Sequence, residues 1–172
     1  MNSKGDILGL IAGRRVRRPA LDLPFLDALF RRLTLCAGAE ASSTEDKIWM
    51  VWMDHPHRGA ATSLDLATRD IAARRYDIAE TRLTQLLRRA PDFAEAWHKR
   101  ATLYYLLGRD QECLDDIRRT LELEPRHFAA MLHFAEILLG DGASTEARFA
   151  FYAALTVNPH LPRAREALAD KP

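Results

Sequence analysis

From residue 22 onward, apolar and polar residues of this chain alternate with a helical period. The clearest segment runs from Pro91 to Pro125, with the sequence PDFAEAWHKRATLYYLLGRDQECLDDIRRTLELEP. It holds two periodic stretches on either side of Gly108. Because proline cannot continue a helix and glycine suits the turn that ends one, the segment predicts one complete helix-turn-helix unit.

The same pattern returns at intervals of 34 residues on both sides of this unit. Prolines, small residues and large apolar residues each recur in register: Pro91, Pro125 and Pro159; Ala67, Ala101 and Ala135; Ala79, Cys113 and Ala147; Leu83, Ile117 and Phe151. Small residues let two helices of a pair approach closely, and large ones fill the remaining volume. We therefore expect units at 60–93, 94–127 and 128–161, of which the first is degenerate because Arg74 replaces the turn glycine.

Further helices are expected before the repeats, at 21–58. Pro24 suits a first helical turn, and an apolar face follows at Leu26, Leu29, Phe30 and Leu33. A break at 38–43 precedes a second helix, for which Ser42 and Glu45 form a capping-box signature. Its apolar stripe includes Trp49 and Trp52. We interpret the pair as a cap on the open end of the stack, with a ligand-stacking site as the alternative for the tryptophans.

The two ends of the chain have different characters. Residues 1–20 carry five basic residues and one acidic residue without a sustained helical period, which favours a mobile basic arm. Docking to an acidic partner and organelle targeting stay open for this arm. Residues 162–172 are expected to form a short capping helix and tail, because a repeat stack leaves its last apolar face uncovered.

Composition excludes several classes of protein. The chain has 172 residues, of which 48% are hydrophobic and 28% charged, and a formal net charge of +1. A net charge this close to zero gives no overall basic field that would attract nucleic acid. No apolar run is long enough to span a membrane. Two cysteines, Cys36 and Cys113, are too few for a disulfide framework, so a reducing, cytoplasmic location is expected.

The chain shows no sequence signature of catalysis. It lacks the nucleophile, zinc-helix and phosphate-loop motifs, and we expect neither catalysis nor a cofactor or metal. Asp54-His55-Pro56-His57 is interpreted as a solvated turn rather than a metal site, and Cys113 as a buried, inert thiol. Arg100 falls between helices and requires a partner, for which Asp115 and Asp116 are the candidates.

The 34-residue frame, with Trp97, Ala101, Tyr104, Gly108 and Pro125 in the central unit, resembles the tetratricopeptide repeat. The resemblance covers residues 60–161 and implies an all-α solenoid of three helix-turn-helix units. In that family the first helices line a concave groove that binds peptides. The corresponding residues of this chain are Leu64, Thr68, Ile71, His98, Lys99, Thr102, Tyr105, Leu132, His133, Glu136 and Leu139, with Asp65 and Glu95 on the same surface.

The resemblance implies a scaffold or adaptor whose partner is a protein or peptide segment. Relatives that bind acidic chaperone tails carry a cationic clamp, and its positions hold Leu64, Thr68, Lys99, Ala129 and His133 here. Most of the clamp is missing, so acidic-tail recognition is disfavoured. A dedicated chaperone, similar to those of type III secretion translocators, and a structural subunit of a larger assembly stay open as alternatives. A stable monomer would favour the adaptor, and insolubility without a partner would favour the subunit.

Overall fold

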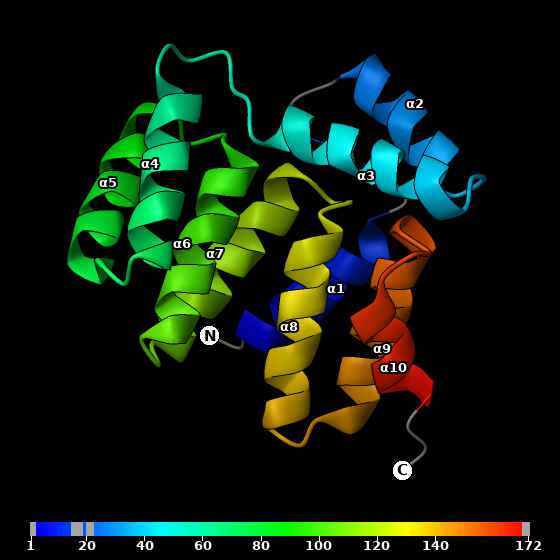
Figure 1. Ribbon diagram of the computed structural model, residues 1–172. Coiled ribbons are helices and arrows are strands. Elements are labelled where there is room, and N and C mark those ends of the chain that lie inside the picture. The colour runs from blue at the N-terminus through cyan, green and yellow to red at the C-terminus, as the bar shows by residue number, and fades with distance from the viewer. Residues whose placement is uncertain (1–2, 15–18, 20–22, 170–172) are drawn as a thin grey trace.

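A computed structural model describes residues 3–14, 19 and 23–169 of the chain. Within these residues the fold is entirely helical, as expected for the solenoid class, and Figure 1 shows the arrangement. The helices are α1 (Ser3–Gly13), α2 (Pro24–Leu33), α3 (Gly38–Trp52), α4 (Ala60–Ala72), α5 (Tyr76–Arg89), α6 (Ala94–Leu106), α7 (Asp110–Leu123), α8 (Phe128–Gly140), α9 (Ser144–Val157) and α10 (Pro162–Ala169). In the part of the chain that the structure describes, no helix is both long and apolar enough to cross a bilayer.

Three antiparallel pairs, α4–α5, α6–α7 and α8–α9, form the stack. The small residues of the 34-residue frame are all fully buried where the two helices of a pair meet: Ala67, Ala79, Ala101, Cys113, Ala135 and Ala147. Burial raises the pKa of the Cys113 thiol to about 12, so this cysteine is an inert packing residue, as predicted. The small residues that recur every 34 positions in the sequence therefore form the contact between the two helices of each pair.

The turn inside each pair uses a left-handed residue at the same frame position. Gly108 and Gly142 have φ of 67° and 77°, and Arg74 has φ of 57°. Glycine adopts this conformation without a steric penalty, whereas an L side chain is strained in it. The α4–α5 turn therefore has the same left-handed geometry as the other two turns, but Arg74 is strained in it.

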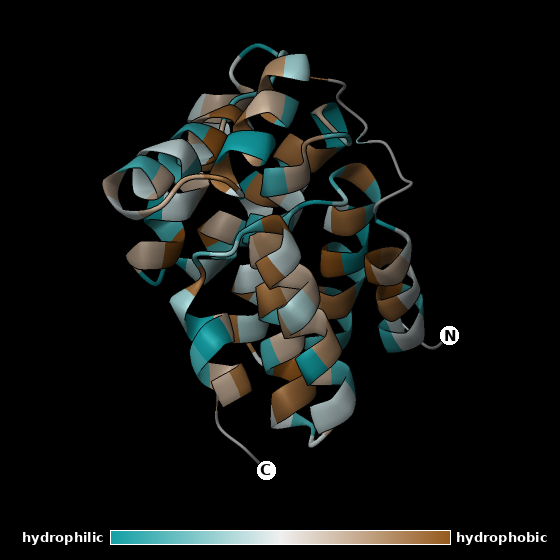
Figure 2. Cartoon of the chain, turned by 90° about the vertical axis from the view of Figure 1, so that its right-hand side faces the viewer, coloured by the Kyte–Doolittle hydropathy of each residue, from teal (hydrophilic) through white to brown (hydrophobic). Residues whose placement is uncertain are grey.

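Residues 3–14 are not part of a mobile arm. They form α1, whose Ile7 and Ile11 are fully buried against α7 and α9. Hydrophobic residues occupy much of this helix, which lies beside the label N in Figure 2. Lys4 pairs with Asp141 at 2.7 Å, and the Arg14 guanidinium donates to the Thr156 hydroxyl. The expectation of an arm over 1–20 is wrong for this stretch, and residues 15–18 and 20 lie outside the described residues.

The α2–α3 hairpin also departs from expectation. Its second helix begins at Gly38, so the predicted break and the Ser42 capping box lie inside α3. Trp49 and Trp52 do not cover the first-repeat end. Trp52 stacks on His127 with ring centroids 4.2 Å apart, and both tryptophans contact Phe128 at the start of α8.

Polar contacts hold the hairpin on the third pair and its neighbouring loops. Arg126 pairs with Asp27 of α2, and the Asn158 amide donates to Glu45 of α3 at 2.9 Å. The hairpin lies across the ends of the helices, as the upper part of Figure 1 shows. The last helix, α10, packs on α9 and buries Ala164 there.

Arg100 has the partner expected from the sequence. Its Nε lies 2.7 Å from one carboxylate oxygen of Asp116, and its Nη2 lies 2.9 Å from the other. This two-point ion pair connects α6 to α7, and the guanidinium also lies over the rings of Trp97 and Tyr104. Of the two candidate aspartates, Asp116 is therefore the partner.

Candidate peptide-binding surface

The first helices of the three pairs carry all the predicted groove residues, and we call their common face the first-helix surface. Its residues are Leu64, Thr68 and Ile71 on α4; His98, Lys99, Thr102 and Tyr105 on α6; and Leu132, His133, Glu136 and Leu139 on α8. The Tyr105 and His133 rings meet edge to face, with centroids 4.9 Å apart, so α6 and α8 are neighbours on this surface.

Two of these side chains are exposed and large. Tyr105 retains 46% of its surface and Leu139 retains 49%, whereas Ile71 and Leu132 are half-buried. Tyr105, Leu139 and Ile71 occupy the same position of the 34-residue frame. The surface therefore presents one apolar side chain per first helix in a regular row.

Leu64 and His98 are corrections to the predicted set. The Leu64 side chain is fully buried in the core that α4 forms with α5 and α6, and His98 is 7% exposed. Glu95, expected on the same surface, is 1% exposed. None of these three side chains is available to a peptide.

The hydroxyl groups of the surface are turned back onto their own helices. Thr68 donates to the Leu64 carbonyl at 2.9 Å, and Thr102 donates to the His98 carbonyl at 3.0 Å. These bonds satisfy the hydroxyl donors within the helix. Neither threonine is poised to donate to a ligand.

Lys99 is less accessible than the sequence suggested. Its side chain is 24% exposed, and its Nζ lies 3.1 Å from Oε1 of Glu95 and 5.9 Å from the ring centroid of Trp49. A lysine that compensates a buried carboxylate serves stability. Lys99 is the one cation at the clamp positions, and it is paired with Glu95 and partly covered by Trp49 of α3.

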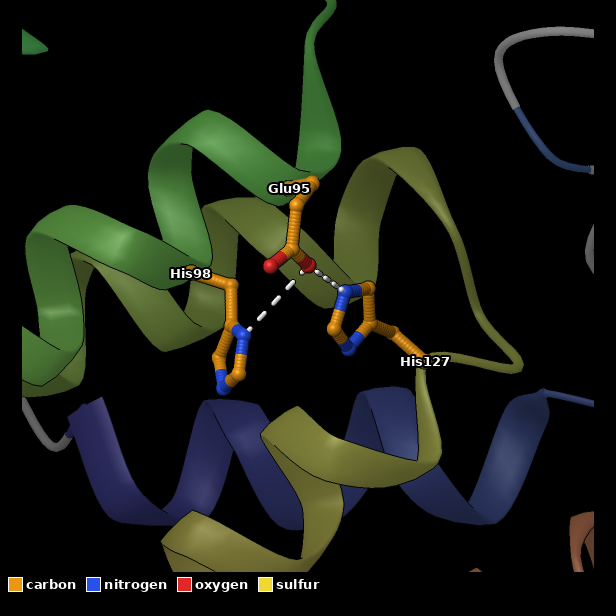
Figure 3. A group of neighbouring side chains, drawn as sticks. All are labelled: Glu95, His98 and His127. Carbon is orange, nitrogen blue, oxygen red and sulfur yellow. Dashed lines mark hydrogen bonds and ion pairs between the residues drawn. The ribbon is translucent and has the colours of Figure 1, made fainter. Parts of the chain in front are cut away.

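Glu95 and His98 of α6 form a buried cluster with His127, which precedes α8 (Figure 3). Nε2 of His127 is 2.9 Å from Oε2 of Glu95, and Nδ1 of His98 is 3.5 Å from the same oxygen. Burial opposes ionisation of Glu95, but the hydrogen bond from His127 and the nearby His98 ring outweigh it and hold the pKa of Glu95 well below the usual range. Burial lowers the pKa of His98, which is therefore neutral at physiological pH.

These three residues offer ligand atoms within 4.8 Å of one another, so we tested whether they fit a metal ion. Nδ1 of His127 accepts from the backbone N–H of Ala130 at 3.2 Å, so the ring proton is on Nε2 and points to Glu95. A metal bound to Nε2 would require the ring proton to lie on Nδ1. That proton would then face the N–H of Ala130, and the hydrogen bond from Ala130 would be lost. The metal would also face the Lys99 ammonium. The cluster fits a structural hydrogen-bond network and does not fit a metal.

The other histidines that were candidates for metal binding lie apart from this cluster. The His55 side chain is nearly buried and its Nε2 lies 3.1 Å from Asp92, whereas His57 is exposed. The interpretation of the segment as a fully solvated turn is therefore wrong for His55. Its ring packs against Phe93 with centroids 4.7 Å apart, so it closes the loop between α3 and α4.

On the α8 part of the surface, His133 is neutral and the charge of Glu136 is paired. Burial, with smaller effects of His98 and Arg163, lowers the pKa of His133 to about 4, so the ring is neutral at physiological pH. Glu136 pairs with Arg163 of α10 at 2.9 Å. Apolar and neutral side chains thus dominate around Tyr105 and Leu139.

Comparisons with known proteins agree with this architecture. A family model described as "Tetratricopeptide repeat" matches residues 64–112. A TPR repeat-containing protein of Rhizobium etli is 33% identical over 118 residues, which are 68% of this chain and 58% of that protein. DnaJ homolog subfamily C member 3 of Rattus norvegicus is 34% identical over 77 residues, 45% of this chain and 15% of that protein.

A solved structure has the same fold. The crystal structure of the Sgt2 TPR domain from Aspergillus fumigatus aligns with a TM-score of 0.60 at 16% identity, covering 66% of this chain and 77% of that one. This chain contains tetratricopeptide repeats.

Two features of this tetratricopeptide-repeat protein lie outside the matched repeat segment. The family model ends at Glu112, within α7, and the α1 helix and the α2–α3 hairpin precede it. The Trp49 and Trp52 contacts that cover Lys99 and His127 belong to this added part. The repeat frame alone could not have located them, because their partners are at least 50 residues away in the sequence.

Proposed function

We propose that this tetratricopeptide-repeat protein is a non-enzymatic adaptor that binds a peptide or helical segment of another protein in a groove on its first-helix surface. One observation carries the proposal: Ile71, Tyr105 and Leu139 form an apolar row with one member per repeat, and the last two are half exposed. Large apolar side chains that stay exposed in a regular row are typical of interaction sites.

The chemistry around this row favours an apolar ligand over an acidic tail. Lys99 is committed to Glu95, Arg163 is paired with Glu136, and His133 is neutral at physiological pH. A partner carboxylate would therefore lose water without gaining a free cation in the row. Apolar side chains of the partner, spaced to meet Tyr105 and Leu139, would gain the contact area instead.

A comparison of two double variants tests the proposal. Tyr105→Ser with Leu139→Ser removes the two exposed members of the row. Phe149→Ser with Tyr152→Ser removes two comparably exposed aromatic residues on α9, outside the surface. Each immobilised protein is exposed to lysate of the source cells, and captured proteins are quantified by mass spectrometry. We expect a protein held by wild type to be lost only with the first variant. Equal retention by both variants would reject this surface, and circular dichroism would verify that both are folded.

A further inference from the structure

A second apolar surface lies on the α2–α3 hairpin and is made of residues outside the first helices of the three pairs. Phe25 is 64% exposed and Met50 is 71% exposed, and they line a pocket of about 590 Å³ together with Leu23 and Val51. Both rank among the most exposed large apolar side chains of the described residues. Exposed apolar patches of this kind mark contacts with another molecule.

Two charges flank this pocket, Lys47 on α3 and Asp54 just beyond the end of α3. In the part of the chain that the structure describes, neither has an ion-pair partner, and the Asp54 carboxylate accepts only the backbone N–H of His55. Several other charged groups of the hairpin are paired: Arg126 pairs with Asp27, and Arg32 pairs with Glu40. The patch therefore combines apolar area with two unsatisfied charges of opposite sign.

The spacing of these charges is self-complementary. Lys47 and Asp54 are seven residues apart, and Met50 and Val51 lie midway between them in the sequence. In a two-fold dimer, each residue that contacts a second residue is contacted by it in return. Two α3 helices that cross antiparallel at Met50 would bring each Lys47 to Asp54 of the second copy.

We propose that the chain forms a two-fold dimer through α3, with Met50 and Phe25 of each copy covering the pocket of the other. The dimer would pair two lysines with two aspartates around an apolar centre. It uses none of the residues of the first-helix surface, so this proposal does not rest on peptide binding. It would also make the adaptor bivalent.

Charge reversal provides a test with an internal folding control. Lys47→Glu and Asp54→Lys each convert two attractive pairs into repulsive ones, so each variant alone should dimerise at least about tenfold more weakly in sedimentation equilibrium. In a heterodimer of the two variants, one site pairs the introduced Glu with the introduced Lys, and the other site pairs Asp54 with Lys47. We therefore expect the mixture to form a heterodimer of near wild-type affinity, which also shows that both variants are folded.

Met50→Glu, which places two carboxylates near the axis, should be monomeric. Leu139→Ser, outside the patch, should dimerise as wild type does. A monomeric wild-type protein at concentrations of about 100 μM, where complexes of ordinary affinity form, would overturn the proposal. So would a dimer that tolerates both single charge reversals, because its interface would lie elsewhere.

Discussion

Nε2 of His127 donates a hydrogen bond across 2.9 Å to Oε2 of Glu95, and both side chains are fully buried. The bond joins the first turn of α6 to the start of α8, and Trp52 of α3 stacks on the same imidazole. The His127 donor, the nearby His98 ring and the Lys99 ammonium at 3.1 Å compensate the buried negative charge of Glu95.

Lys99→Ala should therefore destabilise the protein. Removing the ammonium leaves the Glu95 carboxylate undercompensated, and we expect the free energy of unfolding to fall by about 1–3 kcal/mol in urea titrations. Arg88→Ala is the matched control, since Arg88 is exposed on α5 without an ion pair among the described residues, and it should change stability by less than about 0.5 kcal/mol. If the two variants are equally stable, Lys99 does not support Glu95.

The tryptophans should differ in their contribution to stability. Trp52 is buried and stacked on His127, so Trp52→Ala should lower the free energy of unfolding by about 3–5 kcal/mol. Trp97 occupies a frame position that predicted a core residue, but it is only half-buried, and its indole N–H donates to the Pro91 carbonyl. Trp97→Ala should cost less than Trp52→Ala under the same conditions, and the reverse order would contradict this assignment of the core.

Arg74→Gly should stabilise the first pair. The substitution relieves a left-handed side chain, and we expect a gain of roughly 0.5–1 kcal/mol, less than the full 1–2 kcal/mol strain because glycine also gains freedom in the unfolded chain. Gly108→Arg makes the opposite change at the equivalent position and should destabilise. Thermal melts of both variants would show shifts of opposite sign, and shifts of the same sign would rule out backbone strain as the cause.

His133 should make stability depend on pH. Its pKa in the folded protein is about 4, below its ordinary value of 6.5, so between these values the unfolded chain binds a proton that the folded chain does not. The stabilisation is complete above about pH 6.5 and is lost as pH falls toward 4, with a slope of up to about 1.4 kcal/mol per pH unit. His133→Gln should flatten the slope, whereas His57→Gln, which changes an exposed histidine, should leave it unchanged. An unchanged slope in His133→Gln would show that other groups cause it.

The parts of the fold that could be predicted from the sequence are those set by local spacing. The helical pairs, the buried small residues such as Ala101 and the Arg100–Asp116 ion pair all follow from a frame within one repeat. The burial of Glu95 and His98 could not be predicted in this way, because it depends on α3 packing over residues at least 40 positions later. Helix α1 was missed for the same reason, since Ile7 and Ile11 bury themselves only against α7 and α9.

The position of α1 has a consequence for how the protein acquires its structure. Repeat stacks can fold progressively, because each unit contacts only its neighbours. Here α1 packs against α7 and α9, which are synthesised about 100 residues later. The apolar face of α1 therefore has no native partner until α7 and α9 have been synthesised, and loop closure over this distance slows its docking.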